Sequence, residues 1–269
     1  MEFMRILPVP GLFFVGVESI NLACKDVAAP KTRVPHAYVA CIVTLVLACF
    51  GVLFTAASLP PGILALQHEL TPLSAGFQAL FRVPARVAVL FSLPATYATA
   101  SGFMFCFGRQ LRAMGRSGLA NPLLGEGAVG YKTPVYSLLA GSAVALIICF
   151  IVQYEPYMRA QLFNLSMMCA VASYFTQFAS FVILRTKFAT IRREFVSPLG
   201  MGGAAYGCGV FFLAFVAICG FQETRIAIVA FVVFVALTSL YYYLVVRARQ
   251  SISQEEKTVM FHLYLLKRK

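Results

Sequence analysis

The apolar segment that opens the chain carries one carboxylate. Glu18 follows the run Leu12-Phe13-Phe14-Val15-Gly16-Val17 and is the only acidic residue within a predicted hydrophobic span. A carboxylate at membrane depth is costly and marks a functional site by default. Gly16, with Pro8 and Pro10 upstream, offers a place where a helix can break and expose backbone polar groups. This combination predicts a discontinuous helix that lines a solute site.

Two interpretations of Glu18 stay open at this point. Burial without a partner would favour the protonated carboxyl and let it carry a proton, which suits a coupling or gating residue. Alternatively, the side chain makes a structural hydrogen bond to a neighbouring helix or reaches the inner interface.

A second polar set lies in the apolar window 87–108. Ser92, Thr96 and Thr99 are spaced by four and three residues, which places them on one face of a helix. Pro94 lies among them and frees a carbonyl of the preceding turn. Such a face could ligate a cation or a polar solute. Hydroxyls that bond back to their own helix fit the pattern equally well.

Gln177 is the third polar candidate, in the window 160–184, where it shares a face with Ser173 and Ser180. A primary amide has two donors and one acceptor to satisfy, so Gln177 is expected to face protein or a water-filled cavity rather than lipid. It therefore joins the candidate substrate-binding residues.

The elements that position these residues are expected to be membrane helices. The chain has 60% apolar residues and 12% charged residues, whereas soluble domains have about 25% charged residues. About 20 apolar residues are needed to cross a bilayer as a helix. We expect an all-α multi-pass membrane bundle that forms one domain over residues 1–250, followed by a cytoplasmic tail at 251–269. Its seven spans are expected at residues 6–24, 37–58, 87–108, 133–151, 160–184, 202–221 and 226–246.

The net charge of +12 has a membrane explanation. If the amino terminus lies outside, most basic residues fall in the predicted inner loops and the tail, which orients the carboxyl terminus to the cytoplasm. A nucleic-acid partner is therefore not expected. The basic run Arg109–Arg116 also fits an anionic inner leaflet, and we favour a topology anchor over a specific lipid site there.

Enzyme chemistry has no support in the sequence. The eight cysteines show no Cys-x-x-Cys spacing, and the three histidines are scattered. No nucleophile elbow or Walker-type loop is present. We expect no catalytic residues, metal or cofactor.

Three motifs in order carry a family resemblance. The first is Phe14-Val15-Gly16-Val17-Glu18-Ser19, followed by Lys25-Asp26, Pro30-Lys31 and Pro35. The second is Gly108-Arg109-Gln110-Leu111-Arg112-Ala113-Met114-Gly115-Arg116-Ser117-Gly118 with Thr133-Pro134, and the third is Arg193-x-Phe195-x-x-Pro198-Leu199-Gly200. Together they resemble the amino acid-polyamine-organocation (APC) superfamily of transporters. The second motif is closest to its ethanolamine and amino acid permease branch.

The resemblance implies that the chain corresponds to helices six to twelve of the leucine-transporter fold, whose broken first and sixth helices surround a central site. The break would fall at about Leu12 to Gly16, with Phe13 and Phe14 lining the site. Glu18 would act in gating or proton coupling. Ser92, Thr96 and Thr99 would lie on a helix that contributes to a sodium site in sodium-coupled relatives.

The function implied is part of a secondary active transporter for an amino acid, a polyamine or a small amine such as ethanolamine, working by alternating access. The coupling ion, H⁺ or Na⁺, stays open. The first five helices are expected to be missing, so this chain alone is not expected to transport. The alternative is a truncated membrane protein with an assembly or regulatory role. Either protein would be integral to a membrane, expected to be the plasma membrane.

Overall fold

The computed structural model describes residues 1–59, 73–126, 133–155, 157–189, 193–222 and 225–250, with Lys257 and Phe261; the side chains of Leu12 and Lys25 are not described. These residues form helices and no strand, so the expected all-α fold is confirmed. Apart from Lys257 and Phe261, the expected tail at 251–269 lies outside the described residues.

Six helices in the described part of the chain are long and apolar enough to cross a membrane. This agrees with a multi-pass integral membrane protein. The long helices are α3 (Pro30–Ser58), α7 (Leu93–Arg116), α8 (Val135–Tyr154), α9 (Tyr157–Lys187), α10 (Gly200–Phe221) and α11 (Ile226–Tyr241). Each contains or overlaps one of the last six expected spans.

Short helical elements connect or extend the long ones. They are α5 (Ser74–Phe81), α6 (Ala85–Ala88), η3 (Val89–Ser92), η4 (Pro122–Gly125), η5 (Tyr242–Val246) and α12 (Arg247–Arg249). The segments α6 and η3 lengthen α7, while η5, a π-helical turn, and α12 lengthen α11.

The expected first span, at residues 6–24, is not one continuous helix. It consists of α1 (Glu2–Ile6), α2 (Pro8–Gly11), η1 (Leu12–Phe14) and η2 (Val17–Asp26). The physical reason is local, because proline restricts the backbone before residue 11 and Gly16 adopts a positive φ. For this reason six helices, rather than the expected seven, meet the length of a span among the described residues.

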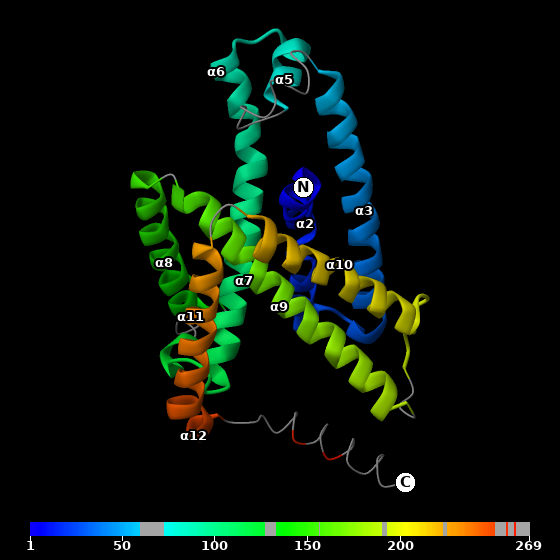
Figure 1. The fold of residues 1–269 in the computed structure, drawn as a ribbon, viewed down its shortest axis with the longest axis vertical. Coiled ribbons are helices and arrows are strands. Elements are labelled where there is room, and N and C mark those ends of the chain that lie inside the picture. The colour runs from blue at the N-terminus through cyan, green and yellow to red at the C-terminus, as the bar shows by residue number, and fades with distance from the viewer. Residues whose placement is uncertain are drawn as a thin grey trace.

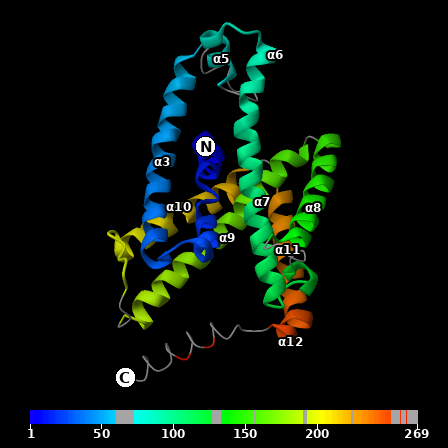
Figure 2. The ribbon, with the colours of Figure 1, turned by 180° about the vertical axis from the view of Figure 1, so that it is seen from behind.

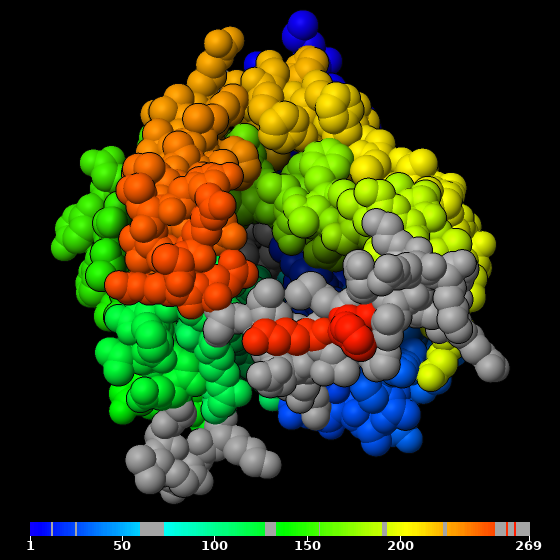
Figure 3. Space-filling model, turned by 90° about the horizontal axis from the view of Figure 1, so that it is seen from below, coloured from blue at the N-terminus to red at the C-terminus, as the bar shows by residue number. Residues whose placement is uncertain are grey.

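Figures 1 and 2 show α3 and α7 as two long helices that extend along the molecule, with the amino-terminal segment between them in both views. The helices α9 and α10 pack against each other and cross in front of that segment in the view of Figure 1. At one end of the molecule, the dark blue amino-terminal segment is visible in a recess between α9 and α11 (Figure 3).

The buried core lies where the amino-terminal segment meets α9 and α10. Met167, Met168 and Ile218 are almost fully buried there, and Val15 packs against them. By contrast, large apolar side chains on the long helices are exposed, such as Leu47 at 68%. Exposed apolar side chains of this kind suit contact with lipid tails, while the core holds the broken segment in place.

Candidate solute site at the Gly16 break

The backbone changes direction at Val15 and Gly16, between the end of η1 and the start of η2. Gly16 has φ +104° and ψ −12°, a left-handed conformation that side-chain-bearing residues adopt only at a cost. A Cβ added to Gly16 would meet no atom within 4 Å. Glycine is therefore required by the backbone conformation and not by crowding.

Glu18 closes this break through three hydrogen bonds. The backbone N–H of Gly16 donates to Glu18 Oε2 at 3.0 Å, and the Tyr174 hydroxyl donates to the same oxygen at 2.6 Å. The Tyr38 hydroxyl donates to the backbone carbonyl of Glu18 at 3.0 Å. Since Tyr38 belongs to α3 and Tyr174 to α9, one residue joins the break to two long helices. The geometry realises the hydrogen-bonded interpretation of Glu18.

The ring of Tyr174 is itself held in place. It stacks on Phe211 of α10, with ring centroids 4.5 Å apart and an angle of 24° between the planes. Stacking fixes the ring, and the phenol oxygen is left to bond outside the aromatic pair. The position of the Glu18 carboxylate therefore depends on α9 and α10 together.

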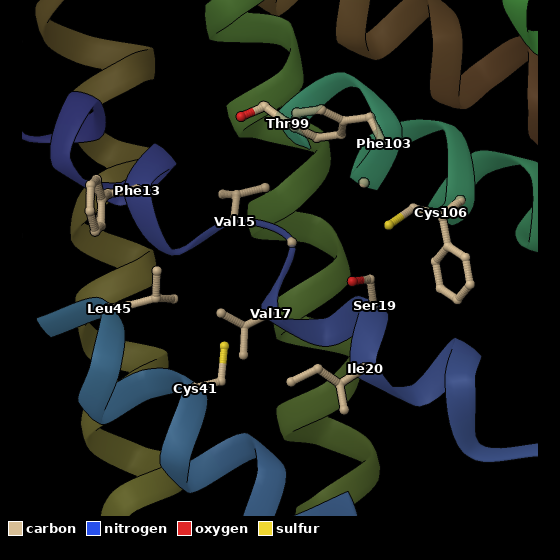
Figure 4. A pocket seen from close by; sticks show the side chains of 13 residues that line it. Phe13, Val15, Val17, Ser19, Ile20, Cys41, Leu45, Thr99, Phe103 and Cys106 are labelled. Carbon is tan, nitrogen blue, oxygen red and sulfur yellow. The ribbon is translucent and has the colours of Figure 1, made fainter. Parts of the chain in front are cut away.

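A cavity of about 360 Å³ lies beside the break. Figure 4 shows its lining side chains, which come from the amino-terminal segment, α3 and α7. They belong to Phe13, Val15, Gly16, Val17, Ser19, Ile20, Cys41, Leu45, Thr99, Gly102, Phe103, Phe105 and Cys106. The described walls are mostly apolar, and their polar groups include the hydroxyls of Ser19 and Thr99, the thiols of Cys41 and Cys106 and the backbone at the break. Cavities of this size and composition suit a small organic solute.

The expected substrate-binding residues are only partly assembled around this cavity. Phe13, Val15 and Gly16 line it. Phe14 is not among the described lining residues and packs edge-on against Phe13, with centroids 5.7 Å apart. The side chain of Leu12 lies outside the described atoms.

Gln177 is also not among the described lining residues. Its side chain is exposed, and its Nε2 donates to Ser173 Oγ of the same helix at 3.4 Å. The amide thus finds one acceptor one turn away on its own helix.

The hydroxyls in the window 87–108 do not form a common cluster. Thr96 donates to the carbonyl of Ser92 at 3.0 Å, and Thr99 donates to the carbonyl of Ala95 at 2.9 Å. Bonding back to the preceding turn satisfies each hydroxyl within its own helix. Of the three candidates for a cation site, only Thr99 is among the described residues that line the cavity.

Tyr38 and Tyr174 are the functional candidates that sequence reasoning missed. Tyr38 lies at the start of the expected span 37–58 and Tyr174 in the middle of the span 160–184, and both are half-buried. A phenol removed from water usually needs a hydrogen-bond partner. For Tyr174 that requirement was the available signal, because a lone carboxylate in another span is a natural acceptor. Tyr38 donates to the backbone carbonyl of Glu18, an acceptor that no side-chain pattern reveals.

Beyond the break, η2 is attached to α7. Arg109 donates from Nη1 to the carbonyl of Leu22 at 2.8 Å and forms an ion pair with Asp26. Its guanidinium also lies over the Phe105 ring, 4.4 Å from the centroid. These contacts fix the far end of η2, just as Glu18 fixes its start.

The described residues contain no group of three or more histidine, cysteine or acidic side chains that could hold a metal ion. The comparisons with known proteins add no further assignment, because no family model, curated protein or solved structure matches the chain.

Proposed function

We propose that this chain forms part of a secondary active transporter that moves an amino acid, a polyamine or a small amine such as ethanolamine by alternating access. The observation that carries the proposal is the break at Gly16, where backbone and side chains line a cavity between two membrane-length helices, α3 and α7. Irregular backbone at membrane depth is tolerated where it is buried or lines a cavity, and transporter sites use broken helices in this way.

Contacts among the family-like motifs support the same proposal. Asp26 of the first motif pairs with Arg109 of the second. His36, directly after the first motif, packs edge-on against Phe195 of the third, with ring centroids 5.9 Å apart. Motifs that lie far apart in the sequence therefore meet in space, as we expect if the three motifs form one APC-like fold.

In this proposal the chain supplies helices six to twelve of a leucine-transporter fold. The cavity at the break is one part of the site, and five further helices would supply the rest. Glu18 acts as the gating or coupling residue, because its carboxylate bridges the break and α9. Release of Tyr174 from that carboxylate would free the break to move, with H⁺ or Na⁺ as the coupling ion.

Thermal stabilisation of the purified chain by solutes tests the site directly. Amino acids, polyamines and ethanolamine are added separately, and one amine class is expected to raise the melting temperature. A Gly102→Phe substitution should abolish that effect, because Gly102 lines the cavity and an added Cβ there meets no atom within 4 Å. Gly51→Phe on α3 is the matched control, since its Cβ would also be unobstructed and Gly51 is not among the described lining residues.

Proteoliposomes test whether the chain is complete for transport. With this chain alone, we expect no saturable uptake of amino acids or ethanolamine. Robust uptake would contradict the division of the site between this chain and further helices. Stabilisation that survives Gly102→Phe unchanged would contradict the assignment of the cavity.

A further inference from the structure

A second, larger cavity of about 1000 Å³ lies between η2, α7 and the start of α8. We call it the arginine pocket. Its described lining consists of Asn21, Leu22, Cys24, Asp26, Tyr97, Ser101, Met104, Phe105, Arg109, Arg112, Ala113, Arg116, Thr133, Pro134 and Leu138. It shares Phe105 with the solute cavity, but the described lining of the solute cavity contains no arginine.

The arginine pocket carries an excess of positive charge. Arg109, Arg112 and Arg116 follow one another at spacings of three and four residues, so they lie along one face of α7. Asp26 is the only acidic side chain in the described lining, and it pairs with Arg109. The described lining thus holds two positive charges more than negative ones. Low-dielectric walls around such charges attract an anion.

Arg116 is fixed in a position that suits anion binding. Its Nε donates to the carbonyl of Gly125 at 3.2 Å. That bond anchors the side chain through its inner nitrogen and does not use the two terminal amino nitrogens, which form the fork that binds phosphate oxygens.

The same face of α7 changes character along its length. Tyr97, Ser101, Met104 and Phe105 precede the arginines in the lining, and Leu138 of α8 adds to the apolar wall. At 1.5 Å per residue, Tyr97 lies about 18 Å along the helix from Arg109. That length matches the hydrocarbon thickness of one leaflet, about 15 Å. The lining therefore combines a charged end with a mostly apolar wall of acyl-chain length, in which the Ser101 hydroxyl bonds back to the carbonyl of Tyr97.

We propose that the arginine pocket binds an anionic phospholipid, with the phosphate at Arg112 and Arg116 and an acyl chain along α7 from Phe105 and Met104 toward Tyr97, against Leu138. Free phosphate would use the charged end but not the apolar wall, so the combined lining favours the lipid. A topology anchor requires basic residues near the membrane but no cavity. The cavity is what distinguishes a specific site from an anchor. This inference does not depend on the proposed transport function.

Native mass spectrometry of the full chain in a neutral detergent tests the inference. The chain is offered phosphatidylglycerol, phosphatidylcholine with the same acyl chains, or inorganic phosphate. Phosphatidylglycerol should be retained at least about tenfold more tightly than phosphatidylcholine, because two surface arginines each favour an anionic lipid. Arg112→Gln combined with Arg116→Gln should remove that preference. Arg185→Gln combined with Lys187→Gln, in the last turn of α9, is the control with the same loss of charge.

A second variant keeps the test decisive if loss of Arg116 disturbs folding. Ala113→Glu places a negative charge in the pocket lining while every arginine stays in place, and it should also reduce the preference, by about fivefold for the one added charge. Equal retention of the two lipids, or an unchanged preference in Ala113→Glu, would overturn the proposal. Equal loss in the α9 control would show general charge attraction. Inorganic phosphate bound as tightly as phosphatidylglycerol would assign the pocket to a soluble anion and overturn the lipid assignment.

Discussion

The Tyr174 hydroxyl donates a hydrogen bond of 2.6 Å to Glu18 Oε2, although 156 residues separate the two in the chain. Glu18 lies two residues after Gly16, so this bond connects the middle of α9 to the helix break. The break is therefore held from outside its own segment, by a donor whose ring is stacked on Phe211. A substitution at Tyr174 should therefore weaken the hydrogen bonding that holds the break, while the described lining of the solute cavity stays the same.

Tyr174→Phe should lower the free energy of unfolding by about 1–2 kcal/mol, because the substitution removes one hydrogen bond to a carboxylate and keeps the ring. Denaturant titration in detergent micelles measures this change. Tyr206→Phe on α10 is the control, since Tyr206 is 75% exposed, and it should change stability by less than about 0.5 kcal/mol. Equal losses in the two variants would contradict a specific bond to Glu18.

Gly16→Ala should destabilise the chain by about 1–2 kcal/mol, because a Cβ is unfavourable in the left-handed region. Gly51→Ala should stabilise it by up to about 1 kcal/mol, because alanine is the better helix former. A Cβ at either position meets no atom within 4 Å. The opposite signs therefore isolate the backbone conformation as the cause, and chemical unfolding of both variants measures it. The same sign for both would contradict the conformation at the break.

The ion pair between Arg109 and Asp26 should contribute modestly to stability. The Asp26 side chain is 60% exposed, and solvent screens such a pair. A double-mutant cycle with Arg109→Gln and Asp26→Asn should give a coupling energy of about 0.5–1 kcal/mol that decreases with added salt. The more exposed pair of Arg5 and Glu2, at 3.7 Å, is the comparison and should give almost no coupling. Equal coupling energies in both pairs would show that the Arg109–Asp26 pair stabilises the attachment of η2 no more than an ordinary surface ion pair does.

Much of the helical architecture could be predicted from the sequence. Long apolar windows leave few alternatives to membrane helices, and the expected spans overlap the six long candidates. The break could also be predicted, because Pro8, Pro10 and Gly16 act on their own backbone. These properties are local, so a single segment is sufficient to reveal them.

The contacts of polar side chains could not be predicted in the same way. The hydroxyls of Thr96 and Thr99 could either face a cation or solute or bond back to the preceding turn. Both residues bond back to a backbone carbonyl. Gln177 likewise bonds within α9. The pairing of Tyr174 with Glu18 depends on how α9 crosses the amino-terminal segment, and spacing within either segment does not determine that crossing. Similarly, counting charges in the run Arg109–Arg116 does not reveal the cavity beside it.

Gly115→Ala should separate η4 from α7. A Cβ at Gly115 would collide with the backbone nitrogen of Gly125, and backbone cannot move aside as a flexible side chain can. Overpacking of this kind costs about 1–3 kcal/mol. The displacement should also break the hydrogen bond from Arg116 to the Gly125 carbonyl.

Amide hydrogen exchange should therefore rise in η4, while exchange in α3 stays unchanged. Gly102→Ala in the same helix meets no atom within 4 Å and should leave η4 protected. Unchanged exchange at η4 in Gly115→Ala would contradict the close packing of η4 on α7, on which the position of Arg116 depends.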